Sequence, residues 1–139
     1  MTTNRISSRR PLVVMFGLLA CALLSGCGGT RIGGKVLRGD IGTVVIVNST
    51  DPRLSQPGIG GIEIELSTPV AGRGGRVVLA TGVTDDTGAF SLNAGPAKKL
   101  PSRLSIRASG ENEYEVRNTI FRPQTGEQVL VLMRRPKTP

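Results

Sequence analysis

Alternation of apolar and polar residues is the feature that most constrains how this chain folds. Residues 62–66 read Ile-Glu-Ile-Glu-Leu, which places three aliphatic side chains on one face of an extended strand and two carboxylates on the other. Residues 103–108 and 115–120 alternate in the same way, and residues 43–47 and 129–133 are continuous apolar runs suited to strands buried on both faces. No stretch that follows the N-terminal leader keeps the 3.6-residue period of an amphipathic helix. The sequence therefore predicts an all-β domain.

Turn-forming segments separate these runs. Residues 39–42, 72–75 and 85–88 carry the glycines and aspartates that tight turns need. The remaining strand candidates are residues 35–38, 76–84 and 89–92. Seven or eight short strands in about a hundred residues favour one Greek-key β-sandwich of about seven strands, which we place at residues 34–135.

The N-terminal segment has the layout of a secretory signal. Arg5, Arg9 and Arg10 precede an uncharged apolar stretch at residues 11–24, and residues 1–10 contain no acid. The stretch is shorter than the roughly 20 apolar residues of a spanning helix. A short membrane anchor and a buried helix are the alternative interpretations, and the absence of partner helices in the rest of the chain argues against the second.

The residues that follow the apolar stretch resemble a known processing motif. Leu24-Ser-Gly-Cys27 resembles the lipobox of bacterial lipoprotein signal peptides. The resemblance implies cleavage before Cys27, a diacylglyceryl group on its thiol and a membrane as the partner of that lipid. It divides the chain into a signal peptide (1–26), a lipidated cysteine with a flexible tether (27–33), the sandwich and a tail (136–139). Because Gly28 and not Asp follows the cysteine, an outer membrane is favoured over an inner one.

The cysteine and histidine counts limit the chemistry. The chain has two cysteines and no histidine, so catalysis by an imidazole group and metal binding through histidine are both excluded. Cys21 leaves with the signal peptide and Cys27 is consumed by lipid, although a disulfide between them is a competing interpretation. We expect no enzyme activity and no cofactor.

The charge balance is basic. The chain carries 18 Lys and Arg against 10 Asp and Glu, and cleavage would remove three arginines and no acid. The cations are scattered and aromatic residues are few, which argues against nucleic acid as a partner. The simplest interpretation is a solvated basic surface without a partner. The more specific interpretation is a surface attracted to anionic lipid headgroups or acidic envelope polymers.

Three segments in order resemble one domain family. Gly34-Lys-Val36, residues 61–66 and Thr84-Asp-Asp-Thr-Gly-Ala-Phe90 resemble the carboxypeptidase regulatory-like domains, which share the transthyretin-like sandwich. B-type repeats of surface adhesins would have nearly the same pattern. The resemblance implies an accessory, non-catalytic domain with an envelope protein or polysaccharide as a further partner. The urate-pathway hydrolases of this fold rely on histidines, so the resemblance does not extend to their activity.

The turn within the last of these segments has a clear physical basis. Asp85 is expected to accept hydrogen bonds from turn amides, Gly88 to take the strained position and Phe90 to enter the core. The alternative for Asp85 and Asp86 is a calcium site shared with Asp40 or Asp51, which we rank below the turn because there is no regular array of aspartates.

Other candidate contacts are less specific. Glu63 and Glu65 are expected on a solvated strand face, where Arg103 or Arg107 can pair with them across strands. Tyr114 is a candidate ligand contact or a buried side chain with a bonded hydroxyl.

A ligand-binding module is the alternative to a purely structural domain. Residues 48–61 are too polar and too interrupted by glycine and proline to form a strand, and long loops of this kind often carry function. Loops 48–61 and 69–76 would together form a site for a peptide or glycan. The resemblance to a lipobox implies a defined role for one residue, Cys27, as the site of lipid attachment.

Overall fold

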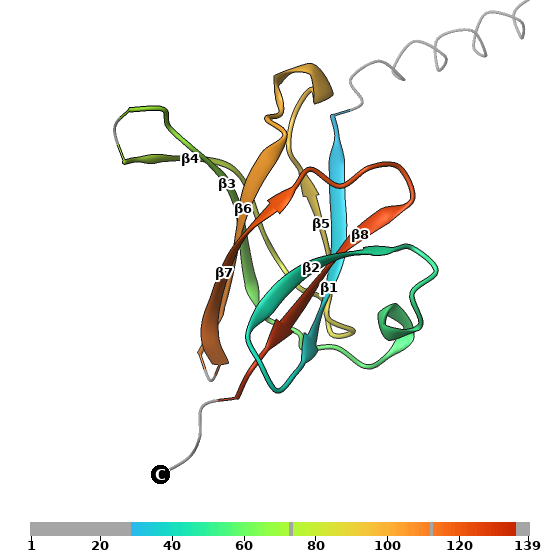
Figure 1. The fold of residues 1–139 in the computed structure, drawn as a ribbon. Coiled ribbons are helices and arrows are strands. Elements are labelled where there is room, and N and C mark those ends of the chain that lie inside the picture. The colour runs from blue at the N-terminus through green and yellow to red at the C-terminus, as the bar shows by residue number, and fades with distance from the viewer. Residues whose placement is uncertain (1–28, 73, 112, 136–139) are drawn as a thin grey trace, which may run out of the picture.

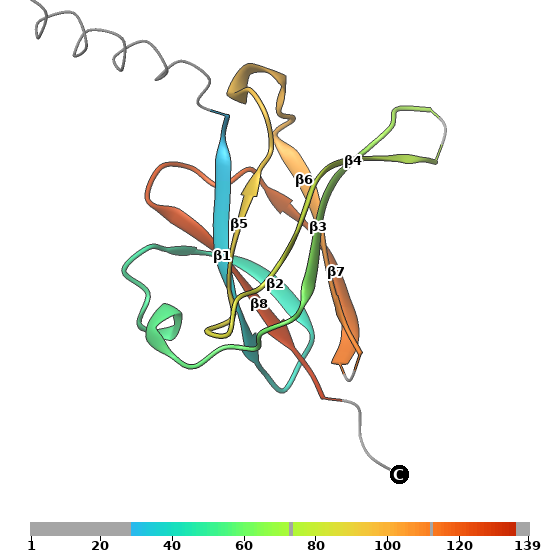
Figure 2. The same ribbon diagram turned by 180° about the vertical axis from the view of Figure 1, so that it is seen from behind.

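The computed structural model describes residues 29–72, 74–111 and 113–135, and it is an all-β sandwich (Figures 1 and 2). The eight strands are β1 (Arg31–Arg38), β2 (Thr43–Asn48), β3 (Glu63–Pro69), β4 (Arg76–Val83), β5 (Ala89–Asn93), β6 (Arg103–Gly110), β7 (Glu113–Phe121) and β8 (Glu127–Met133). Two short 3₁₀ turns are η2 (Pro52–Ser55) and η3 (Ala97–Lys99). The predicted all-β class is confirmed, with eight strands instead of about seven.

The strands form two four-stranded sheets. The first sheet has the order β2-β8-β1-β5 and the second has the order β4-β3-β6-β7. All neighbouring pairs are antiparallel except β1 and β8, which run parallel. Between the sheets, the side-chain amide oxygen of Asn118 on β7 accepts the hydroxyl of Thr43 on β2 at 3.3 Å and the Val44 N–H at 3.2 Å, so these two edge strands lie side by side.

The core fills the space between the two sheets. Aliphatic side chains that alternate along each strand point inward, as the period of two requires. The predicted inward residues of three strands are confirmed as buried: Ile62, Ile64, Leu66, Leu104, Ile106, Ala108, Val116 and Ile120. The predicted burial of residues 129–133 on both faces is confirmed for Leu130, which points away from this core and is still fully buried, whereas Leu132 is only partly buried. For residues 43–47 the same prediction holds only in part, because Val44 and Val47 are buried and Val45 and Ile46 are partly buried.

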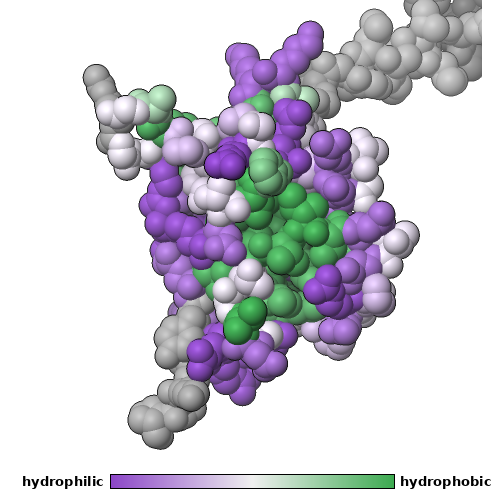
Figure 3. Space-filling model, in the orientation of Figure 1, coloured by the Kyte–Doolittle hydropathy of each residue, from purple (hydrophilic) through white to green (hydrophobic). Residues whose placement is uncertain are grey.

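One apolar area stays visible at the surface. Figure 3 shows it on the side where β2, β7 and β8 face the viewer, with hydrophilic residues around it. On β2 and β8 the side chains of Val45, Ile46 and Leu132 are only partly buried.

The first strand is longer than predicted, so the expected flexible tether at residues 27–33 is wrong for residues 31–33. β1 begins at Arg31, Ile32 is 2% exposed in the core, and Gly34 pairs with both β5 and β8. A Cβ atom on Gly34 would collide with the Val129 carbonyl and the Phe90 ring, which explains why a glycine stands here. Gly34 therefore marks close packing of three strands and does not belong to a linker.

Candidate functional site

The expected lipid-attachment residue, Cys27, lies outside the described residues, together with the expected signal peptide 1–26 and tail 136–139. The described residues start close to it in sequence. Thr30 donates its N–H to the Gly95 carbonyl at 2.7 Å and accepts the Ala94 N–H at 2.9 Å. Three residue steps therefore separate Cys27 from a backbone group held by the sandwich.

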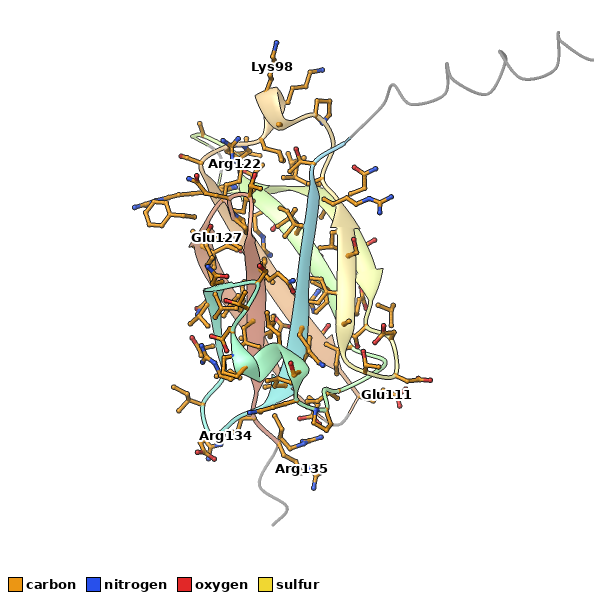
Figure 4. All side chains as sticks on the ribbon, turned by 90° about the vertical axis from the view of Figure 1, so that its right-hand side faces the viewer. Lys98, Glu111, Arg122, Glu127, Arg134 and Arg135 are labelled. Carbon is orange, nitrogen blue, oxygen red and sulfur yellow. The ribbon has the colours of Figure 1, made fainter. Side chains whose placement is uncertain are left out.

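The strand directions divide the connections between two ends of the sandwich. We call the end at which β1 begins the proximal end; it also carries the β5–β6 connection, the β7–β8 connection and the first residue of β6. The opposite, distal end carries the β1–β2, β4–β5 and β6–β7 connections and the residues that follow β8. Figure 4 shows Lys98 and Arg122 at one end of the molecule and Glu111, Arg134 and Arg135 at the other.

Charge is distributed unequally between these ends. Apart from Arg76 of the β3–β4 hairpin and the ion pair of Asp51 with Arg53 in the β2–β3 connection, the proximal end carries five cations and one acid: Arg31, Lys98, Lys99, Arg103, Arg122 and Glu127. The distal end carries three cations and six acids: Arg38, Arg134, Arg135, Asp40, Glu63, Asp85, Asp86, Glu111 and Glu113. The two ends therefore have opposite net charge, which the linear sequence does not show.

Contacts to backbone carbonyls fix Arg122, one of the proximal cations. The Arg122 guanidinium donates to the Ala97 carbonyl at 3.1 Å and to the Leu100 carbonyl at 3.2 Å, which ties the β7–β8 connection to η3. In the described part of the chain, none of the five proximal cations lies within ion-pair distance of an acid. The Glu127 carboxylate accepts the Gln124 N–H at 2.7 Å.

A shallow cavity lies between these segments. It has a volume of about 410 Å³ and is lined by Thr30, Arg31, Ala97 and residues 122–125. Two guanidinium groups and no carboxylate line it, so it can accept an anionic group. Beside it, the Arg103 guanidinium lies 5.4 Å from the centre of the Phe121 ring, a cation–π contact, and the Phe121 side chain is 66% exposed.

The long connection between β2 and β3 is a packed cover. Residues 49–61, which we call the crossing segment, run from the proximal to the distal end over the outer face of the first sheet (Figure 2). Leu54 packs there against buried Leu37, Val47 and Leu130, and the Lys35 ammonium donates to the Leu54 carbonyl at 2.9 Å.

The two loops of the predicted peptide or glycan site are not brought together. The β3–β4 hairpin arm (residues 68–72 and 74–78) extends from one side of the proximal end, whereas the crossing segment covers the other sheet (Figures 1 and 2). The two segments lie on opposite sides in both views, so they do not enclose a common cavity.

The predicted turn at residues 85–88 is confirmed. The Asp85 carboxylate accepts the Thr87 N–H at 2.9 Å, the Thr87 hydroxyl at 2.7 Å and the Ala89 N–H at 3.0 Å. The hydrogen bond from the Thr87 hydroxyl, followed by that from Ala89, holds the pKa of Asp85 below its usual range. Gly88 adopts a φ of 81° and Phe90 is buried.

The calcium alternative gains no support from this geometry. The Asp51 carboxylate pairs with Arg53 at 2.8 Å, and the hydrogen bond from this arginine lowers the pKa of Asp51. Within residues 29–72, 74–111 and 113–135, no three potential metal-ligating side chains of Asp, Glu, Cys or His form a group.

An ion-pair ladder occupies the outer face of the second sheet. Arg107 contacts Glu115 at 2.8 Å and Glu65 at 3.9 Å, and Arg117 contacts Glu115 at 3.2 Å. The hydrogen bond from Arg107 lowers the pKa of Glu115 and raises that of the guanidinium itself. The predicted pairing with Arg107 is confirmed for Glu65, whereas Arg103 stacks on Phe121 instead.

Sequence reasoning missed the basic proximal end. Its cations come from four separate segments, which looked scattered along the chain. Strict alternation of strand direction would have placed Arg31 at one end and Lys98 and Arg122 at the other, because it assumes that β3 runs opposite to β2. The crossing segment breaks this alternation, since β2 and β3 both run from the distal to the proximal end.

Two general comparisons complete the description. No helix in the described ranges is long and apolar enough to span a bilayer. No family model, curated protein or solved structure matches this chain.

Proposed function

We propose that this chain is a lipid-anchored cell-envelope protein whose β-sandwich has a structural, accessory role without catalysis. The observation that carries the proposal is the position of Cys27, which ends the Leu24-Ser-Gly-Cys27 motif and stands three residues before the first backbone group bonded into the sandwich. A lipobox cysteine at this place would become the N-terminus of a mature protein that is almost entirely sandwich. An outer membrane is the favoured location, because Gly28 follows the cysteine.

Lipid on Cys27 would make a durable anchor, and the proposed cleavage leaves no thiol with which this cysteine could form a disulfide. Each buried methylene group contributes about 0.8 kcal/mol, so a single chain holds only marginally, whereas two or three chains on one residue hold a protein durably. Cys21 lies within the apolar stretch that the peptidase would remove, which leaves Cys27 without a thiol partner.

Two observations support an accessory domain of the carboxypeptidase regulatory-like, transthyretin-like type with Greek-key connections. The Asp85–Gly88 turn and the buried Phe90 have the arrangement expected for this segment, and the Thr84 hydroxyl ties the turn to the β2–β3 connection, because it donates to the Ile59 carbonyl at 2.8 Å and accepts the Ile62 N–H at 2.9 Å. In addition, the carboxylates of Asp85 and Glu115 are engaged in structural contacts, a use that fits a scaffold.

Replacement of the two cysteines tests the anchor. In cells that export the protein, we expect the Cys27→Ala variant to lose metabolic labelling by palmitate and to retain its signal peptide, whereas the matched Cys21→Ala variant is labelled and cleaved like the parent. Globomycin, which blocks the lipoprotein peptidase, should make the parent accumulate at precursor length. Mass spectrometry of the parent that finds an unmodified sulfur on Cys27 would refute the anchor.

A further inference from the structure

We propose that the proximal end is a membrane-contact surface that rests on anionic lipid headgroups and inserts Phe121 into the interface. This inference rests on the proposed lipid anchor and goes beyond it, because an anchored domain can also stand away from the bilayer. The occupant to which we commit is a membrane containing anionic phospholipid.

The first argument is the length of the connection. A chain advances at most about 3.6 Å per residue, so three steps from Cys27 to Thr30 span about 11 Å. Thr30 is bonded on both its N–H and its carbonyl to the β5–β6 connection. A lipidated Cys27 therefore holds the proximal end within about 11 Å of the headgroups, which is close to the Debye length of about 8 Å at physiological ionic strength.

The second argument is charge. Besides Arg76 of the hairpin and an ion pair of the crossing segment, five cations and one acid lie at this end, and no acid in the described structure forms an ion pair with any of the five. Lys98 and Lys99 are exposed on η3, and Lys98 reaches outward from the end (Figure 4). The cavity lined by Arg31 and Arg122 adds a place for a phosphate group. Basic residues next to a membrane anchor are attracted by the negative surface potential of anionic lipids.

The third argument is the apolar side chain among these cations. Phe121 is 66% exposed at the end of β7, and the Arg103 guanidinium lies over its ring. Exposure of a phenylalanine to water is unfavourable, whereas an aromatic ring flanked by cations is the pattern of surfaces that lie in the membrane interface. The exposed valines of the hairpin arm, Val70, Val77 and Val78, extend on one side of the same end.

The distal end provides a natural comparison. It has an equally exposed apolar residue, Ile41, also at 66%, but three cations and six acids. Arg38 there is paired with Glu113 at 2.9 Å. The negative net charge of this end would be repelled by an anionic surface.

The absence of tryptophan allows a direct depth measurement. The full chain, processed and extracted from membranes of the expressing cells, is reconstituted as Phe121→Trp and, separately, as Ile41→Trp. The vesicles contain phosphatidylglycerol together with bromine-labelled phosphatidylcholine, whose bromine atoms quench indole fluorescence only at contact. We expect at least a threefold loss of emission for Phe121→Trp and little loss for Ile41→Trp. Equal quenching of the two variants, or none for Phe121→Trp, would overturn the proposal.

Charge reversal tests the role of the cations. In the Phe121→Trp background, Lys98→Glu with Lys99→Glu should remove most of the quenching, whereas Arg134→Glu with Arg135→Glu, the same change in net charge at the distal end, should leave it. Vesicles of phosphatidylcholine alone should also give weak quenching. If all of these samples quench alike, headgroup charge does not hold this end, and the proposal fails.

Two controls separate this inference from the anchor. Flotation of the parent with the vesicles reports the lipid anchor: loss of flotation refutes the proposed function, whereas full flotation without quenching refutes only the membrane-contact surface. If the indole of Phe121→Trp is already shielded in neutral detergent and bromine-labelled lipid adds nothing, a second copy of the chain covers this end, and the proposal is overturned.

Discussion

Of the two connections that flank β3, the more polar one packs against a sheet, whereas the more apolar one is exposed to solvent. The crossing segment before β3 is polar and rich in glycine and proline, yet it packs on a sheet through Leu54 and the Lys35 hydrogen bond. The hairpin arm after β3 carries Val70, Val77 and Val78, yet these side chains are 36% to 51% exposed. The comparison shows that the surface beneath a connection, more than its own polarity, decides whether it packs.

The difference originates in the sheets. The first sheet presents Leu37, Val47 and Leu130 on its outer face. Removing these apolar side chains from water is favourable, so a segment that covers this face stabilises the fold. The arm has no comparable surface beneath it, because β6 pairs with β3 only as far as Ser67 and a register shift follows Leu66. Two strands without a third remain exposed on both faces.

The largest expected contrast in stability comes from truncating one side chain beneath the crossing segment and one in the hairpin arm. Leu130→Ala should lower the free energy of unfolding by about 4 kcal/mol, because it leaves a cavity beneath the crossing segment. Val78→Ala in the arm should change it by less than about 0.5 kcal/mol, since that side chain is half exposed. Urea unfolding followed by circular dichroism measures both, and similar losses would contradict the contrast.

Glycine replacement sharpens the same comparison with a smaller effect. Gly88 has a φ of 81°, and a Cβ there would lie 2.6 Å from Gly58 and Ile59 of the crossing segment. Gly88→Ala should lower the free energy of unfolding by about 3 kcal/mol, because alanine is strained at a positive φ and its methyl group would clash with the crossing segment. Gly72 in the arm has a φ of 78° with open space around it, so Gly72→Ala should cost about 1 kcal/mol. Thermal unfolding of both variants tests this order, and an equal cost would mean that the crossing segment yields to the new methyl group.

The smallest expected effect is a pH dependence at the turn against which the crossing segment packs. The pKa of Asp85 is lower in the folded than in the unfolded chain, so its stabilisation is present above the unfolded pKa of about 3.9 and is lost as the pH falls through the folded value. Asp85→Asn should therefore be less stable than the parent at pH 7, and the gap should narrow towards pH 2.

The neighbouring Asp86→Asn variant is the control, because no hydrogen bond to the Asp86 carboxylate is found in the described turn. A gap that stays constant over this pH range would show that the carboxylate charge of Asp85 does not stabilise the turn.

The strands and turn were predictable because local rules decide them. The alternation at residues 62–66 fixed which face is buried, and the Asp85–Gly88 turn needs only its own residues. The start of β1 was not predictable, because Gly33 and Gly34 have the composition of a linker, and the role of Gly34 is revealed only when β5 and β8 approach it.

Long-range arrangement explains what else escaped prediction. The cover formed by residues 49–61 depends on Leu130, which is far away in sequence. The basic proximal end depends on strand order, because Arg31, Lys98 and Arg122 meet only after both sheets assemble. Assignment of Cys27 to lipid stays a prediction.

The parallel pairing of β1 with β8 also determines how the molecule bears mechanical load. The chain enters the sandwich at the start of β1 and leaves it at the end of β8, on the opposite side. Tension between the two termini acts along both strands and at right angles to the hydrogen bonds that join them. The backbone hydrogen bonds between Gly34–Arg38 and Val129–Met133 are then loaded together in shear, and they do not break one after another.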